Sequence, residues 1–266
     1  MSYITLSWND LALAAVLLLA NAVVSLRFQL GIERRIIWAG IRMVVQLSLI
    51  GLVLESLFTV VSPWWTVAVA AVMTIAAGRE VRARQDRPFT GAWGYGLGTG
   101  AVMFSGTVVT LLALTTQIRP DPWYDPRYTI PILGMLLGNT LTGTALGLSR
   151  LTDGAIAARP AIEAQLALGA TALDALRPTL RTALRDGMMP IINAMSAAGI
   201  VSLPGMMTGQ ILAGADPSDA IKYQILIMFL IAGATGLGVL AAVGGGAWRL
   251  TDSRQRLRLD RLKADT

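Results

Sequence analysis

The stretch AIKYQILIMFLIAGATGLGVLAAVGGGAW covers Ala220–Trp248 and contains a single charged side chain, Lys222. A helix needs about 20 mostly apolar residues to cross a bilayer, so this stretch is long enough to span one. Just before it, Asp216 can cap a helix and Pro217 can occupy the first helical position. The pattern therefore predicts a transmembrane helix with a well-defined start.

Six further stretches have the same apolar character and similar length. The seven predicted spans are Ser7–Leu26, Ile36–Phe58, Trp64–Gly78, Trp93–Thr116, Tyr128–Leu148, Met189–Ala213 and Ala220–Trp248. Ser62 and Pro63 predict the turn between the second and third spans. We therefore expect an all-α polytopic membrane protein with about seven transmembrane helices, forming a single transmembrane domain over residues 1–266.

Lysine and arginine are concentrated in alternate loops of this predicted fold. The loops at 27–35, 79–90, 150–188 and 249–266 hold 18 of the 22 basic residues. Basic residues are retained on the cytoplasmic side of membrane proteins. We therefore expect the N-terminus outside, the C-terminus in the cytoplasm, and a multi-pass protein of the plasma membrane, which in bacteria is the inner membrane.

The composition excludes several classes of function. Hydrophobic residues make up 54% of the chain and charged residues 14%, against roughly 25% charged in an average soluble domain. The sequence has no cysteine and no histidine, which removes Cys/His zinc sites, thiol nucleophiles and imidazole bases. The two lysines follow Ile221 and Leu262, so the chain contains no ATP-binding phosphate loop. We expect no catalytic residues, no cofactor bound by this chain and no nucleic-acid partner.

A few polar and small residues lie inside the predicted spans. Arg42 and Gln46 share one face of the second span, where they either bond to a neighbouring helix or line a water-filled pathway. Glu55 and Lys222 lie near span ends and can reach the interface. Small-xxx-small pairs such as Gly143/Gly147 predict close helix packing.

The segment around Pro204 and Gly205 predicts an interruption of the sixth span. Irregular backbone at membrane depth is tolerated only where it is buried in protein or lines a cavity. Ser202, Pro204, Met206 and Met207 are therefore candidate residues of a translocation pathway. The alternatives are a simple proline kink and methionines that serve only in packing.

The predicted cytoplasmic loop at 150–188 is too long for a simple connection. Residues 159–186 are rich in alanine and leucine and are interrupted by Gly169 and Pro178, which predicts two short helices parallel to the membrane. Within them, EAQLALGAT at 163–171 presents small side chains around a glycine turn, a shape that fits a groove on a partner. Residues 249–266 are expected to form a short basic amphipathic tail lying against anionic membrane lipid.

The 163–171 segment resembles the cytoplasmic coupling motif of ABC-transporter permeases, E-A-A-x-x-x-G. Glu163, Ala164 and Gly169 occupy matching positions, and Gln165 replaces the second alanine. The hydrophobic-x-Leu-Pro element of the importer motif is absent at its usual spacing.

Several blocks resemble one family, the FetB-like permeases of iron-export ABC transporters, which include plant relatives linked to aluminium tolerance. The longest block is GIVSLPGMMTGQILAGADPSDAIKYQ at Gly199–Gln224. Further similar blocks are Ile130–Met135 with Gly138 and Asn139, the segment 166–171, and Arg42 followed by Gln46. Together they extend from the second to the seventh span.

The resemblance implies a permease that pairs with a separate ATPase subunit, with two copies of each and with ATP and Mg²⁺ on the ATPase. It implies an ATPase-coupling site formed by Glu163, Ala164, Leu168, Gly169, Ala170 and Thr171. It also implies export of iron or a related metal, with Met135 and Asn139 joining the candidate pathway. Since cysteine and histidine are absent, any metal ligands would be oxygens such as those of Glu55, Asn139 and Ser202, helped by methionine sulfur.

Functions of other classes fit the sequence less well. An ion-gradient-driven secondary transporter of a small solute, the main alternative, normally has ionisable residues deep in its helices, and Arg42 is the principal one here. A seven-helix receptor or retinal protein is suggested only by the helix count, the outward N-terminus and a lysine in the last span. Lys222 lies near the outer end of that span rather than near its middle, and such a protein has no use for the long inner loop. A membrane-embedded enzyme needs paired carboxylates or a nucleophile with a base, and the predicted spans contain neither.

Overall fold

The computed structural model describes residues 7–59 and 61–263, and within these residues the regular secondary structure is helical. Its elements are α1 (Trp8–Arg27), α2 (Glu33–Thr59), α3 (Pro63–Ala83), α4 (Trp93–Leu112), the π-helical extension η1 (Ala113–Ile118), α5 (Pro126–Ala157), α6 (Arg159–Ala167), α7 (Ala172–Ala197), α8 (Gly205–Leu212), α9 (Pro217–Arg249) and the short 3-10 helix η2 (Leu259–Arg261). The predicted all-α fold class is confirmed.

The chain divides into two compact units, Met1–Val61 and Ser62–Thr266. In the first unit α1 and α2 form a helical hairpin. The Ser25 hydroxyl holds its turn, donating to the Glu33 carboxylate at 2.9 Å and accepting from the Ile32 N–H at 3.2 Å. Arg42 and Gln46, the two polar residues predicted to share one face of the second span, lie in α2 and so belong to this hairpin.

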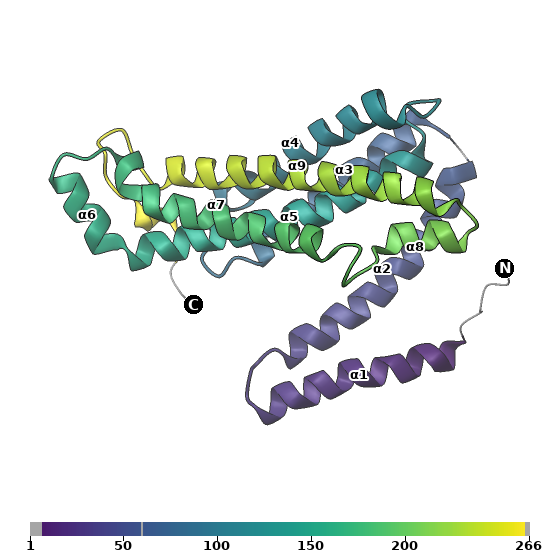
Figure 1. Cartoon of the computed structure of the whole chain (residues 1–266). Coiled ribbons are helices and arrows are strands. Elements are labelled where there is room, and N and C mark those ends of the chain that lie inside the picture. The colour runs from purple at the N-terminus through teal and green to yellow at the C-terminus, as the bar shows by residue number, and fades with distance from the viewer. Residues whose placement is uncertain (1–6, 60, 264–266) are drawn as a thin grey trace. The chain divides into compact units, whose positions relative to one another are not determined.

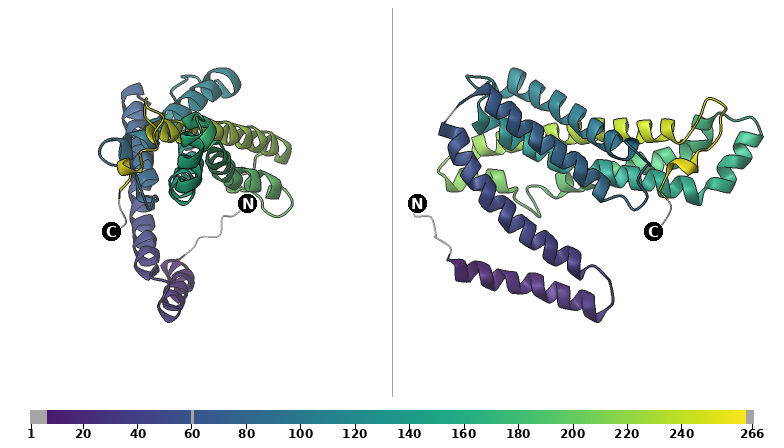
Figure 2. Two further views of the ribbon diagram at one scale, coloured as in Figure 1. Left: turned by 90° about the vertical axis from the view of Figure 1, so that its left-hand side faces the viewer. Right: turned by 180° about the vertical axis from the view of Figure 1, so that it is seen from behind.

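In the second unit α5 lies at the centre and packs against α3, α4, α7 and α9. Figure 1 shows α7 and α9 running alongside α5, and the right-hand view of Figure 2 shows α3 and α4 from behind. A Cβ atom on Gly143 would lie 2.6 Å from the Gly187 carbonyl oxygen and 2.8 Å from Thr235 Cγ2. The close packing predicted at Gly143 and Gly147 is thus confirmed, because only glycine permits this approach of α5 to α7 and α9.

The second unit has two different ends. One, which we call the coupling end, holds α6, the start of α7 and the segment 250–263 that follows α9 (Figure 1). The other, the α8 end, holds α8 and the starts of α5 and α9. Because α5, α7 and α9 run the length of the unit, they connect one end to the other.

Five stretches are long and apolar enough to cross a membrane: α1, α2 up to Leu54, α4 with η1, α5 and α9. The third predicted span corresponds to α3, whose last turns carry Arg79, Glu80 and Arg82. The multi-pass membrane character is therefore supported, whereas the count of seven and the orientation of the termini stay predictions.

The sixth predicted span, 189–213, is wrong as a continuous helix. α7 ends at Ala197 and α8 begins at Gly205, which confirms the predicted interruption near Pro204. Within the connection, the Gly199 N–H donates to the Ser202 carbonyl at 2.9 Å and the Ser202 N–H donates to the Ala197 carbonyl at 3.1 Å. Local hydrogen bonds therefore satisfy part of the backbone that leaves the helix.

The prediction of two short helices at 159–186 is also wrong. α6 is short, but α7 has 26 residues and continues through Pro178 and Pro190. An interior proline costs about 3 kcal/mol because a hydrogen bond is lost and the ring crowds the preceding turn. The buried face of α7 offsets that cost with residues at helical spacing, namely Ala172, Ala175, Leu176, Thr179, Ala183, Gly187 and Ile191.

The helix starts predicted from aspartate, serine and proline are correct. The Asp216 carboxylate accepts from the Ser218 N–H at 2.8 Å, and Pro217 is the first residue of α9. Ser62 is the residue before α3, which begins at Pro63. Lys222 is exposed and forms an ion pair with Asp219 at 3.0 Å, as expected for a side chain near a helix end.

The segment after α9 is folded rather than a free amphipathic tail. Leu257, Leu259 and Leu262 pack on the apolar core of the second unit. Leu262 pairs with Phe89, and the Lys263 N–H donates to the Pro88 carbonyl at 3.0 Å. These leucines therefore face protein, and the connection between α3 and α4 lies against Leu262.

Candidate functional site

The predicted coupling residues lie together in one exposed helix–turn–helix at the coupling end. α6 ends in a turn in which Gly169 adopts a φ of +91°. The Gly169 N–H donates to the Leu166 carbonyl and the Ala170 N–H donates to the Gln165 carbonyl, each at 3.0 Å. This pair of bonds is the Schellman arrangement, which needs a left-handed residue at the position of Gly169. The glycine singled out by the motif thus sets the shape of the turn.

The surface of this turn is small and accessible. Leu168 is 88% exposed, and Glu163, Ala164, Gly169 and Thr171 are also exposed. Glu163 is held by an ion pair to Arg159 at 2.8 Å. We call residues 159–171 the coupling segment, after the motif that they resemble; its outer side is exposed.

The inner side of the coupling segment is fixed to the rest of the second unit. Ile162 is 2% exposed and belongs to the same core as Ala155 of α5 and Leu176 of α7. Thr171 caps α7 by accepting from the Asp174 N–H at 3.2 Å. The segment is therefore anchored to α5 and α7 by core packing and by the cap of α7.

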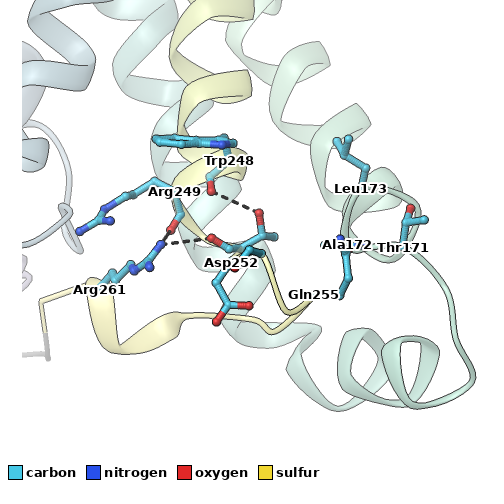
Figure 3. Close-up of a pocket in the computed structure, with 10 residues that line it drawn as sticks. Thr171, Ala172, Leu173, Trp248, Arg249, Asp252, Gln255 and Arg261 are labelled. Atoms are coloured by element: carbon cyan, nitrogen blue, oxygen red, sulfur yellow. Dashed lines mark hydrogen bonds between the residues drawn. The ribbon is translucent and has the colours of Figure 1, made fainter.

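A cavity of about 720 Å³ lies beside the start of α7, between the coupling segment and the end of α9 (Figure 3). Thr171, Ala172, Trp248, Asp252, Gln255 and Arg261 are among the residues that line it. Sequence reasoning missed this arrangement. The available signal was Asp252 followed by Arg254 and Arg256, a spacing that allows one carboxylate to hold a tight turn.

The carboxylate of Asp252 organises that turn. It accepts from the backbone N–H groups of Arg254 and Arg256, each at 3.0 Å, and from Arg256 Nε at 2.9 Å. These hydrogen bonds, that from the Arg256 side chain first, hold the pKa of Asp252 at about 2, below its ordinary value of 3.8. The turn is therefore charged and preformed at neutral pH.

At the α8 end, two predicted pathway residues converge. Met135 of α5 and Met206 of α8 line one cavity of about 360 Å³ together with Arg127, Tyr128, Gln210 and Tyr223. Within the described part of the chain, the buried Gln210 Oε1 has no hydrogen-bond partner. We call this cavity the α5–α8 cleft; the residues that line it bring together two thioethers, the Arg127 guanidinium and a glutamine whose buried oxygen has no partner among the described residues.

Two other predicted pathway residues line a second, more apolar cavity. Pro204 and Met207 face a space of about 570 Å³ with Met195, Gln224 and Met228. The buried Gln224 Oε1 likewise lacks a hydrogen-bond partner among the described residues. We call this cavity the α7–α9 cleft. Because Met206 and Met207 are adjacent, α8 presents one methionine to each cleft.

The remaining predicted pathway residues are dispersed. Asn139 is exposed on α5 and donates from Nδ2 to the Met135 carbonyl at 2.9 Å, and Ser202 is exposed in the connection between α7 and α8. Arg42 and Gln46 are exposed on α2, in the other unit. Glu55 lies in α2, but its side chain is outside the described structure. Among the described residues, no cluster of three or more carboxylates could hold a metal ion.

Comparisons with known proteins give a consistent picture. Residues 8–250 match the model of the uncharacterised protein family UPF0014. The chain is 39% identical over 245 residues to the "UPF0014 membrane protein slr1647" of Synechocystis, covering 90% of this chain and 91% of that protein. It is 30% identical over 258 residues to the "Probable iron export permease protein FetB" of Escherichia coli, covering 96% of each. The "UPF0014 membrane protein STAR2" of Oryza sativa is 34% identical, covering 92% of this chain and 86% of that protein. No solved structure matches the chain.

Proposed function

Because the chain belongs to the UPF0014 family of membrane proteins, we propose that it is the membrane-spanning permease subunit of an ATP-driven (ABC) transporter. The observation that carries the proposal is the coupling segment, which is exposed on one side and anchored in the core on the other. A separate ATPase subunit would bind its exposed turn. Two permease and two ATPase chains would form the working transporter, as the resemblance to the FetB-like permeases implies.

The sequence supports a division of labour between the two kinds of subunit. The chain has no phosphate-binding loop, so ATP and Mg²⁺ would be held by the partner. When the partner closes on ATP, the coupling segment would shift as a rigid body together with α5 and α7. That motion would alter the α8 end, where both clefts lie between elements joined to the moving helices.

The proposed cargo is iron or a related metal ion, moved out of the cytoplasm. This direction and cargo come from the name of the Escherichia coli relative. Met135, Met206 and the carbonyl oxygen of Gln210 are the groups in the α5–α8 cleft that would contact it. Thioether and amide ligands without carboxylates form weak sites, and weak binding suits a route through which the cargo must leave.

The partner is tested by purification. We expect the tagged chain, extracted from its native host in mild detergent, to carry one ATPase in stoichiometric amount by mass spectrometry. Gly169→Asp should reduce that recovery, whereas Gly91→Asp should not. Gly91 is a suitable control because it also has positive φ and open space around it, yet lies outside the coupling segment. A chain that purifies alone as an ordered oligomer would instead favour the gradient-driven transporter.

The cargo is tested on the purified pair in lipid nanodiscs. Ferrous iron and manganese should stimulate ATP hydrolysis, and magnesium in excess of the nucleotide should not. If no metal changes the hydrolysis rate while the pair remains intact, the cargo proposal is wrong and the permease proposal survives.

A further inference from the structure

The segment after α9 forms a tight turn whose tip reaches the first residue of α7, directly after the coupling segment. We call residues 251–257 the tail turn. Thr251 pairs with Leu257 across its base, and the Asp252 carboxylate bonds three donors inside it. Gln255 lies at the tip with a φ of +55°, in the left-handed region that few non-glycine residues adopt. A conformation of this kind persists only where its surroundings impose it.

The tip residue bonds directly to the first residue of α7. The Gln255 side-chain oxygen accepts from the Ala172 N–H at 2.6 Å, across 83 positions of sequence (Figure 3). The first N–H groups of a helix have no partner inside the helix. Thr171 satisfies the N–H of Asp174, and Gln255 satisfies that of Ala172. The start of α7 is thus capped from two sides.

The tail turn is fixed equally firmly to the end of α9. The Arg258 N–H donates to the Leu250 carbonyl at 2.8 Å. Arg261 Nη1 donates to the Arg249 carbonyl at 2.7 Å and to the Thr251 carbonyl at 3.1 Å. A chain of directed bonds therefore runs from the start of α7, through Gln255, to the last turn of α9.

This link differs in kind from the packing between α7 and α9. Those helices meet through small residues, and a Cβ atom on Gly187 would lie 2.7 Å from Val239 Cγ1. Apolar packing of this kind is non-directional. A hydrogen bond to a backbone N–H at the helix end fixes the axial position of α7 against α9.

We propose that Gln255 is a positioning residue that carries displacement of the coupling segment directly into α9. The inference rests on the proposed function, and it adds a second route beside the one through α5 and α7. Because Tyr223 and Gln224 of α9 line the two clefts, this route would reach both of them.

The test compares Gln255→Ala with Gln255→Glu, which keeps an acceptor oxygen at the same reach. Arg254→Ala is the control, since it changes an exposed side chain of the same turn and keeps its backbone donor. The first readout is hydrogen exchange of the amides of residues 172–175 in the purified chain without ATPase. We expect Gln255→Ala to speed this exchange about fivefold, the size of one lost hydrogen bond, and Gln255→Glu to restore it.

The second readout is cargo moved per ATP hydrolysed by the reconstituted transporter. We expect Gln255→Ala to lower this ratio at least threefold with unchanged ATP hydrolysis, and Gln255→Glu to recover it. Unchanged exchange in Gln255→Ala would overturn the inference, and so would faster exchange with an unchanged transport ratio. If exchange responds as expected but no ATPase binds any variant or the parent, the proposed function itself has failed, and the coupling role fails with it.

Discussion

The coupling end and the α8 end of the second unit are held together in different ways. At the coupling end, charged and backbone groups bond to one another: Asp252 holds the tail turn, Gln255 caps α7 and Gly169 closes a fully bonded turn. At the α8 end, methionines surround two cavities, and the buried oxygens of Gln210 and Gln224 have no partner among the described residues.

The two ends therefore differ in their expected stiffness. A densely hydrogen-bonded end keeps its shape under load, because each bond has a defined direction. A methionine-lined cavity repacks at little cost, because the side chain is flexible and unbranched. The structure thus has a densely hydrogen-bonded end, which would receive the motion in the proposed transporter, and an adaptable space at the other end, with α5, α7 and α9 between them.

The largest expected effect comes from deforming the stiff end. Gly169→Asp puts a side chain at a φ of +91° and a charge on the docking surface, so transport should fall more than tenfold while insertion and helix content remain. Transport is measured in proteoliposomes, and helix content is measured by circular dichroism. Normal transport by this variant would show that the coupling site lies elsewhere.

The next effect concerns the helix that joins the ends. Gly143→Ala should destabilise the protein by about 1–3 kcal/mol, because the new methyl group meets the Gly187 backbone oxygen, which has little room to move. Gly138→Ala on the same helix meets open space and should be neutral or slightly stabilising. Thermal unfolding in detergent compares them, and equal melting temperatures would contradict the packing described for α5.

The adaptable end should tolerate substitution structurally but not functionally. The double change Met135→Leu and Met206→Leu conserves volume, so we expect a change in stability below about 1.5 kcal/mol per site. Metal stimulation of the ATPase should nevertheless fall about tenfold, because the thioethers are lost. Met43→Leu with Met103→Leu is the matched control, since both of these methionines are exposed and lie outside the α5–α8 cleft. If metal stimulates the ATPase fully in the variant with Met135→Leu and Met206→Leu, these two methionines serve only in packing.

The smallest effect is a pH dependence of the coupling end. Since folding lowers the pKa of Asp252 from 3.8 to about 2, its contribution to stability is complete above about pH 4 and is lost as the pH falls towards 2. Asp252→Asn should therefore lower the melting temperature slightly at pH 7 and not at pH 2. A difference that persists at pH 2 would mean that the substitution acts through something other than charge.

Local sequence signals predicted the local features correctly. Asp216 with Pro217, Ser62 with Pro63 and the pair Pro204–Gly205 each determine backbone shape through their own chemistry, so the helix starts and the interruption could be read from them. Gly169 likewise determines the shape of its own turn, because it adopts a positive φ. The prolines of α7 were misread because burial on its opposite face, which depends on α5 and α9, outweighs their local cost.

Contacts between distant parts of the chain left no such signal. The bond between Gln255 and Ala172 joins residues 83 positions apart, and no periodicity in either segment indicates it. The convergence of Met135 and Met206 likewise depends on how α8 folds back after the interruption. Two of the three groups of the proposed cargo site, Met135 and Met206, could therefore be named from sequence, whereas Gln210 could not.

The length of α5 has a geometric consequence. Its 32 residues extend about 48 Å at 1.5 Å per residue, against a hydrocarbon thickness of about 30 Å. A helix of this length aligned with the bilayer normal would extend about 18 Å beyond the hydrocarbon as an arm. Tilting such an arm by about 10° would move its tip by about 3 Å, so in the proposed transporter a modest closure of the ATPase would suffice to reorient the whole helix. Shortening the arm by two turns would leave about 7 Å and remove more than half of that leverage.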